Sequence, residues 1–137
     1  MRKVAIILFV LSVVTIKVAV AQAAEDKARF AAEQWIVLVD DGQYDESWKE
    51  ASKIFQSSNP ENDWQKKAES ERNQLGQRQS RKLKDIKTTS TVKGLPAGQY
   101  ILVKYQSSYA NKKGLTETIA AVQEADGNWR VASYTMN

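Results

Sequence analysis

The spacing of the apolar residues changes at Gly76, and this change constrains the fold more than any other feature of the chain. Before it, apolar residues recur every three or four positions, as in Ala28, Ala31 and Trp35, which is the spacing of one helical face. After it, apolar and polar residues alternate, most clearly from Tyr100 to Tyr109, as in a half-buried strand. The sequence therefore predicts helices followed by strands.

Three helices are expected, over residues 24–41, about 45–55 and 60–75. Gly42 and Gly76 end the first and the third, because glycine readily adopts the left-handed conformation found at helix ends. Asp45 and Asn59 are the expected N-caps of the second and third helices, with Pro60 at the first helical position of the third.

Four strands are expected, from about Arg81 to Val92, from Tyr100 to Tyr109, from Leu115 to Glu124 and from Trp129 to Met136. Leu83 and Ile86 have opposite parity, which predicts a bulge between them. Asp126-Gly127 is a strong hairpin signal. The expected fold class is α+β, with three N-terminal helices packed on a curved four-stranded antiparallel meander, because only the helices can cover its apolar face. Curled around the first helix, such a sheet forms a cone with an open wide end.

The first 23 residues have the organisation of a cleavable secretory signal. Met1-Arg2-Lys3 is a basic start, Val4 to Ile16 is largely apolar, and Ala21-Gln22-Ala23 places small residues before a cleavage point. A membrane anchor is the alternative, but the apolar run is shorter than the roughly 20 residues that span a bilayer, and Lys17 interrupts it. We expect residues 24–137 to form a single periplasmic or secreted domain, with no transmembrane anchor after cleavage and no cysteine for a lipid anchor.

The basic composition of the whole chain does not indicate nucleic-acid binding. Arg2, Lys3 and Lys17 lie in the signal, which holds no acid, so its removal lowers the formal net charge from +4 to +1. A nearly neutral domain has no general attraction for polyanions. The chain also has no cysteine, so its stability depends on packing without disulfides.

The lack of histidine and cysteine excludes a thiol nucleophile, a Ser-His relay and zinc sites built on these residues. Carboxylate, lysine, tyrosine and arginine chemistry remains. Asp40-Asp41 and Asp45-Glu46 flank Gly42, but they lack the ligand spacing of a calcium loop, and helix capping explains them better. No metal and no cofactor are predicted.

A basic stretch follows the helices: Arg72, Arg78, Arg81, Lys82, Lys84 and Lys87. Its functional interpretation is contact with anionic headgroups or with an acidic partner. Its simpler interpretation, which we favour, is a solvated strand edge whose charges discourage edge pairing.

Many residues of the chain match one family pattern. They are Trp35, Asp40, Gly42, Tyr44, Ser47, Trp48, Ala51, Phe55, Trp64, Arg72, Leu75, Gly76, Arg81, Leu95, Pro96, Gly98, Tyr100, Glu117, Tyr134 and the run from Asp126 to Val131. In this pattern the chain resembles the bacterial family called domain of unknown function 4019, although Ser133 stands where that family is expected to have glycine. The resemblance implies an exported bacterial protein with a cystatin-like or nuclear-transport-factor-like α+β fold, and it implies no activity.

Core packing is the simplest explanation of the four tryptophans, because aromatic side chains bury the largest areas. The alternative is that Trp48 and several tyrosines line the mouth of a pocket. Glu117 is the polar group of most interest there, with Arg72 or Arg130 as its expected partner. The candidate binding residues are Trp48, Arg72, Arg81, Tyr100, Tyr105, Glu117, Arg130 and Tyr134.

Three functions are compatible with these observations. The leading hypothesis is a non-enzymatic exported domain that binds a small apolar ligand or an envelope protein in the concavity of the sheet. The first alternative is a small enzyme that transfers protons through Glu117 and tyrosines. The second is an accessory or inhibitory protein that docks through the turn from Lys93 to Gly98 or through a strand edge. The sequence does not define the oligomeric state.

The signal peptide is tested directly by mass spectrometry of tryptic peptides from the protein isolated from its own host. We expect the mature chain to begin at Ala24. A peptide that retains Leu11 would contradict cleavage.

Overall fold

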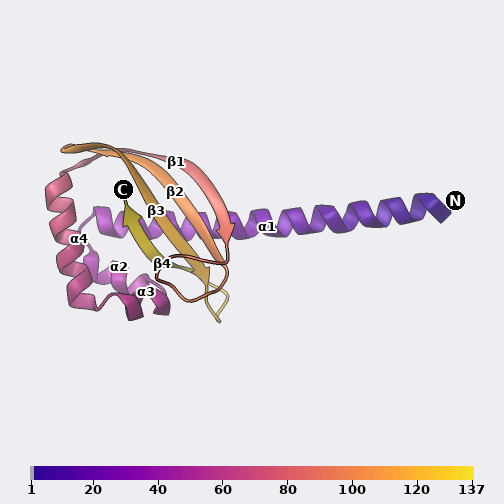
Figure 1. Ribbon diagram of the computed structural model, residues 1–137, viewed down its shortest axis with the longest axis horizontal. Coiled ribbons are helices and arrows are strands. Elements are labelled where there is room, and N and C mark those ends of the chain that lie inside the picture. The colour runs from indigo at the N-terminus through magenta and orange to yellow at the C-terminus, as the bar shows by residue number, and fades with distance from the viewer. Residues whose placement is uncertain (1) are drawn as a thin grey trace.

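The computed structural model describes the backbone of residues 2–137 and the side chains of residues 14–137. Its elements are α1 (Arg2–Asp40), α2 (Tyr44–Glu50), α3 (Lys53–Ser58), α4 (Glu61–Leu75), β1 (Arg78–Thr89), β2 (Tyr100–Tyr109), β3 (Lys112–Gln123) and β4 (Trp129–Met136). The strands form one antiparallel sheet in the order β1-β2-β3-β4, which confirms the α+β meander (Figure 1).

The helices number four in the described part of the chain, whereas three were predicted. The expected helix over residues 45–55 is interrupted at Ala51 and Ser52, which are extended. The amide of Ser52 donates to the carbonyl oxygen of Val131 in β4 at 2.9 Å, and its hydroxyl accepts a hydrogen bond from the Phe55 amide at 3.1 Å. The helix breaks because β4 binds this amide, and the Ser52 side chain then caps α3.

The two predicted N-caps are also wrong. α2 begins at Tyr44 with Gln43 as its N-cap, so Asp45 lies within the first turn. Asn59 belongs to the end of α3, where its side-chain amide donates to the carbonyl oxygen of Phe55 at 2.9 Å, and Pro60 is the N-cap of α4. Gly42 and Gly76 have φ values of 75° and 73°, which confirms the predicted helix ends.

α1 starts far earlier than the predicted residue 24, and it extends beyond the rest of the domain (Figure 1). Residues 14–23 are exposed, and among the described side chains of α1 Ala24 is the first that packs against the core. In the part of the chain that the structure describes, no helix combines the length and apolar character needed to cross a membrane.

The sheet curves over α1, which packs against its core-facing side (Figure 1). Ile36 and Val39 of α1 share the main core with Val103 and Ile119 of the sheet. The pairing of β1 with β2 shifts between Leu83 and Asp85, so the predicted bulge is confirmed.

Four aromatic rings connect the helices to the sheet. Trp35 lies 5.5 Å from the ring centroids of both Phe55 and Tyr134, and 5.6 Å from that of Trp64. The indole NH groups of Trp35 and Trp64 donate to the carbonyl oxygen and the hydroxyl of Ser47, respectively. The predicted role of these tryptophans in the core is confirmed, and their polar atoms are satisfied inside it.

Phe55 and Phe30 form a matched pair for testing this core, because the first is buried and the second is 64% exposed. Phe55→Ala should lower the free energy of unfolding by about 3–5 kcal/mol, since it leaves a cavity among large rings. Phe30→Ala should change it by less than about 0.5 kcal/mol. Urea denaturation of both variants measures the difference, and equal effects would contradict the described packing.

Candidate functional site

Glu117 of β3 is fully buried, and both of its carboxylate oxygens accept hydrogen bonds. Arg81 of β1 donates from Nε to Oε1 at 3.0 Å and from Nη2 to Oε2 at 3.2 Å. The hydroxyl of Tyr109 donates to Oε1 at 3.1 Å, and that of Tyr134 donates to Oε2 at 2.5 Å. Glu117 thus has the bidentate arginine partner that a buried carboxylate requires.

Asp40, the last residue of α1, is the second carboxylate of this cluster. Arg81 donates to it from Nη1 at 2.6 Å and from Nη2 at 3.1 Å, while Arg72 of α4 and Arg78 of β1 donate at 3.3 and 3.2 Å. The side chains of Asp40 and Arg81 are only 13% and 9% exposed. Arg81 therefore bridges the end of α1 to β3.

Arg72 closes the cluster from α4. Its Nη2 also donates to the hydroxyl of Tyr134 at 3.1 Å, and its guanidinium carbon lies 5.4 Å from the ring centroid of Tyr109 and 5.7 Å from that of Tyr134. Such positions over aromatic faces favour a cation. We call the set Asp40, Arg72, Arg81, Tyr109, Glu117 and Tyr134 the buried ion cluster.

Ionisation in the buried ion cluster follows from these contacts. Burial alone would raise the pKa of Glu117, but the hydrogen bonds and charge of Arg81 outweigh it, so the pKa lies below its ordinary value. Burial, together with the charge of Glu117, raises the pKa of Tyr134 well above its ordinary value. Glu117 is therefore an anion and Tyr134 a neutral donor near neutral pH.

Four of the eight predicted site residues lie together: Arg72, Arg81, Glu117 and Tyr134 all belong to the buried ion cluster. The partner of Glu117 is Arg81, so the expected pairing with Arg72 or Arg130 is wrong. Tyr109 is not among the predicted site residues, and Asp40 was interpreted as a helix-capping acid. That interpretation is also wrong, since Asp40 binds three arginines.

The other four predicted residues lie apart from Glu117 or do not bind it. Tyr105 is opposite Glu117 in the sheet, but its buried hydroxyl has no hydrogen-bond partner among the described residues. Tyr100 belongs to a separate cluster with Ala120 and Ala132, and its hydroxyl donates to the carbonyl oxygen of Pro96. The indole of Trp48 donates to the carbonyl oxygen of Asn59. The fourth, Arg130, binds acids next to the β3–β4 turn.

The basic stretch divides into two groups, apart from Arg78, which is exposed on β1 but also binds Asp40. Lys82, Lys84 and Lys87 are exposed on β1, which is an edge strand, as a solvated edge requires. Arg72 and Arg81 are instead enclosed in the buried ion cluster, so the solvated-edge interpretation is wrong for them. They point toward the core because their counter-charges, Asp40 and Glu117, lie there.

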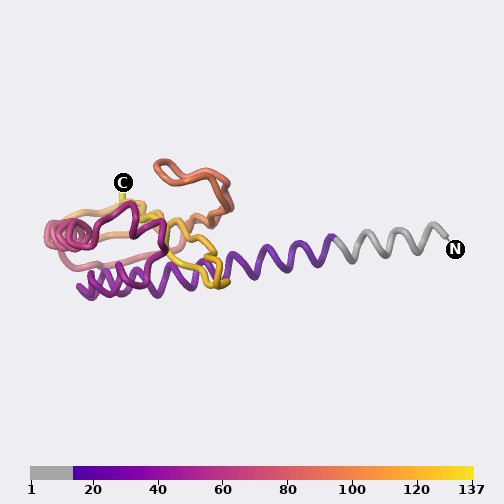
Figure 2. The backbone as a smooth tube through the Cα atoms, turned by 90° about the horizontal axis from the view of Figure 1, so that it is seen from below, coloured from indigo at the N-terminus to yellow at the C-terminus, as the bar shows by residue number. Residues whose placement is uncertain are grey.

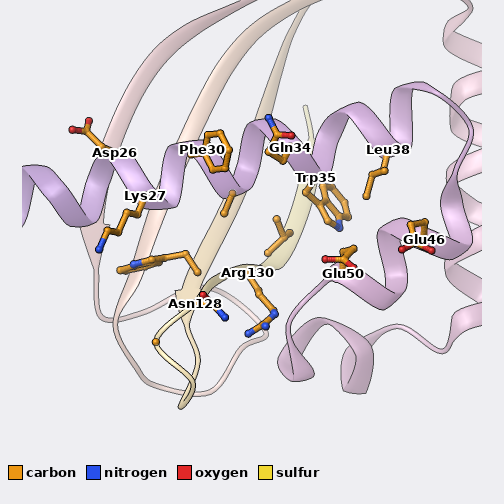
Figure 3. A pocket seen from close by; sticks show the side chains of 14 residues that line it. Asp26, Lys27, Phe30, Gln34, Trp35, Leu38, Glu46, Glu50, Asn128 and Arg130 are labelled. Carbon is orange, nitrogen blue, oxygen red and sulfur yellow. The ribbon is translucent and has the colours of Figure 1, made fainter.

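An open groove of about 900 Å³ lies between α1, α2 and the β3–β4 turn (Figure 3). Phe30, Trp35 and Leu38 of α1 form one wall, while Trp129 and Val131 of β4 contribute apolar surface opposite them. Its charged lining residues are Asp26, Lys27, Glu46, Glu50 and Arg130. Glu117 does not line this groove. The molecule is thus a small α+β domain with a closed internal ion cluster and one large open groove in its described part.

The chain belongs to the family described as protein of unknown function DUF4019, whose model matches residues 31–134. The predicted family resemblance is therefore confirmed. The matched range contains the whole buried ion cluster, whereas Asp26, Lys27 and Phe30 of the groove precede it. No curated protein matches the chain.

Glu117→Gln tests whether the buried ion cluster holds the fold. The variant should lower the free energy of unfolding at pH 7 by about 3–5 kcal/mol, because it leaves buried Arg81 without part of its counter-charge. Urea denaturation measures this loss. The exposed Glu50→Gln is the control and should change stability by less than about 0.5 kcal/mol.

The same variant gives a prediction for pH. The pKa of Glu117 is lower in the folded chain than its ordinary value of 4.5. When the pH falls below 4.5, Glu117 therefore becomes protonated in the unfolded chain while it is still ionised in the folded chain. The contribution of Glu117 is therefore present above pH 4.5 and is lost as the pH falls through the folded-state pKa. The stability difference between wild type and Glu117→Gln should narrow in acid, and a constant difference would contradict the assigned charge.

Proposed function

We propose that this protein is an exported, non-catalytic binding domain, and that the groove between α1, α2 and the β3–β4 turn is its binding surface. The observation that carries the proposal is Phe30, which is 64% exposed and lines a groove of about 900 Å³ together with Trp35 and Trp129. Concave sites with apolar and aromatic walls are the usual places for ligands. The groove lies at the rim of the sheet's core-facing side, which α1 itself fills.

Export is supported by the packing of α1. The expected cleavage point after Ala23 directly precedes Ala24, the first of the described side chains of α1 that contacts the core. Residues 14–23 are exposed, and they include apolar side chains such as Ile16 and Val18. Removal of residues 1–23 therefore leaves the described core intact, and we propose that the mature domain acts in the periplasm or outside a bacterial cell.

Catalysis through Glu117 has less support. A general base must come within hydrogen-bond reach of the proton that it removes. Both oxygens of Glu117 already accept hydrogen bonds from Arg81 and from tyrosine hydroxyls, and the side chain is fully buried. The carboxylate has the surroundings of a structural anion.

Docking through the turn from Lys93 to Gly98 also has less support than the groove. Figure 2 shows the segment between β1 and β2 as a loop at the side of the sheet. Val92 and Leu95 pack against the cluster around Tyr100, so the apolar groups of this loop serve the fold. The edge strand β1 exposes Leu83 at 39%, between two lysines. Neither surface has an exposed aromatic side chain in a groove.

A photo-crosslinking phenylalanine analogue at position 30 tests the proposal in the host of the protein. Irradiation should produce a discrete adduct, because a bound molecule would contact this side chain. Mass spectrometry of the purified adduct determines whether the occupant is a small ligand or a protein.

The matched control carries the analogue at Val37, which is 49% exposed on α1 but does not line the groove. A third variant carries it at Leu83 on the β1 edge. An adduct at position 30 alone supports the groove. Adducts only at position 83, equal adducts at all three positions, or none at position 30 would count against it.

A further inference from the structure

We infer that the groove binds a cationic amphipathic segment of another protein, in which leucine-like side chains alternate with lysine or arginine. This inference rests on the proposed function, because it names the partner of the same groove. It is based on the charges that surround the apolar walls and on how those charges are paired.

The walls require an apolar face on the partner. Phe30 is exposed, and Leu38 and Trp129 are partly exposed beside it. The groove is open to solvent, and its lining comes from α1, α2 and β4 (Figure 3), which suits a peptide segment that lies across it with one face outward. An amphipathic segment meets both conditions, since it buries its apolar face and leaves its polar face in solvent.

The charged residues that line the groove, which we call its rim, determine the charge of that segment. Three acids line the groove, Asp26 from α1 and Glu46 and Glu50 from α2. Glu46 shares the exposed Lys49 with Asp45 through longer ion pairs of 3.9 and 3.6 Å. α2 is therefore acidic overall, because it carries Asp45, Glu46 and Glu50 but only one lysine, and of these four residues only Glu46 and Glu50 line the groove.

Arg130 does not offset these acids, although its side chain also lines the groove. Its guanidinium donates to Glu124 at 2.9 Å and to Asp126 at 3.0 and 2.8 Å. Two carboxylates thus bind one guanidinium, so Arg130 and its two partners, which adjoin the groove without lining it, together carry one net negative charge. Lys27 is the other base in the lining, so the three lining acids outnumber the two lining bases.

The same charges argue against an anionic lipid surface as the occupant. The exposed lysines Lys82, Lys84 and Lys87 lie on β1, at the edge of the sheet opposite to β4 and its groove. An anionic membrane would be attracted to that edge and repelled by the acidic rim. The groove therefore suits a protein segment whose positive charges complement the rim and guide its approach.

The test uses a dye-labelled amphipathic peptide of leucine and lysine and its counterpart with glutamate in place of lysine. Fluorescence anisotropy measures binding to the exported form of the protein, purified from its own host. The lysine peptide should bind at least about 10-fold more tightly than the glutamate peptide, and less tightly as salt is raised, because exposed charges are screened.

Two double variants identify the surface. Glu46→Gln with Glu50→Gln removes two groove acids and should weaken binding of the lysine peptide by about 5-fold to 20-fold. Asp63→Asn with Glu69→Gln removes two exposed acids from α4, outside the groove. This variant should leave binding of the lysine peptide nearly unchanged. Circular dichroism verifies that both remain folded. Equal binding of the two peptides, or equal effects of the two double variants, would overturn the inference.

Failure of this inference can be distinguished from failure of the proposed function. If both peptides bind equally and Phe30→Ala weakens both, the groove is a binding site without charge preference, so only the inference fails. If vesicles with anionic headgroups bind and the groove variants do not weaken that binding, a membrane surface replaces the protein segment. Absence of any adduct at position 30 would contradict the proposed function, because the groove would then not be the binding surface.

Discussion

Arg81 joins two buried carboxylates, and the arrangement of the sheet depends on this contact. It connects β1 to Glu117 of β3 and to Asp40 at the end of α1, while Arg72 and two tyrosine hydroxyls complete the cluster from α4, β2 and β4. β1 itself is mostly exposed and has a weak apolar pattern, so packing alone specifies its register poorly. A slip of one residue would turn Arg81 to the outer face and leave Glu117 buried without its partner. The ion cluster thus fixes a strand that the hydrophobic core does not.

Element types could be predicted because periodicity is a local property of the sequence. The predicted bounds of β2 and β4 match the observed strands, and the bulge in β1 follows from the parity of Leu83 and Ile86. The break at Ser52 could not be predicted in this way. Its cause is the carbonyl oxygen of Val131, which is distant in sequence and becomes adjacent only when β4 packs against the helices. Local propensity favours one continuous helix there, and a tertiary hydrogen bond overrides it.

The candidate site shows the same division between local and long-range information. Glu117 has the parity of Leu115 and Ile119, so its position on the core face could be read from the strand. The identity of its partner could not, because pairing with Arg81 depends on the register of β1 and on the position of its bulge. The groove was harder still to predict, since three elements form it and meet only in the folded chain. Phe30 has no local feature that distinguishes an exposed groove residue from a core residue on the same helix.

Trp35 lies between the two polar regions of the molecule: it lines the groove and makes an edge-to-face contact with Tyr134, whose hydroxyl binds Glu117. On its inner side, charges are paired and excluded from solvent, so a change there disturbs the fold. On its outer side, Phe30 and the acids of the rim are solvent-accessible, so substitutions cost little stability. The family match includes the entire ion cluster but begins after Phe30. Apart from Trp35 and Val131, which belong to both, different residues thus maintain the fold and line the proposed binding surface, so the specificity of that surface can change while the internal framework is retained.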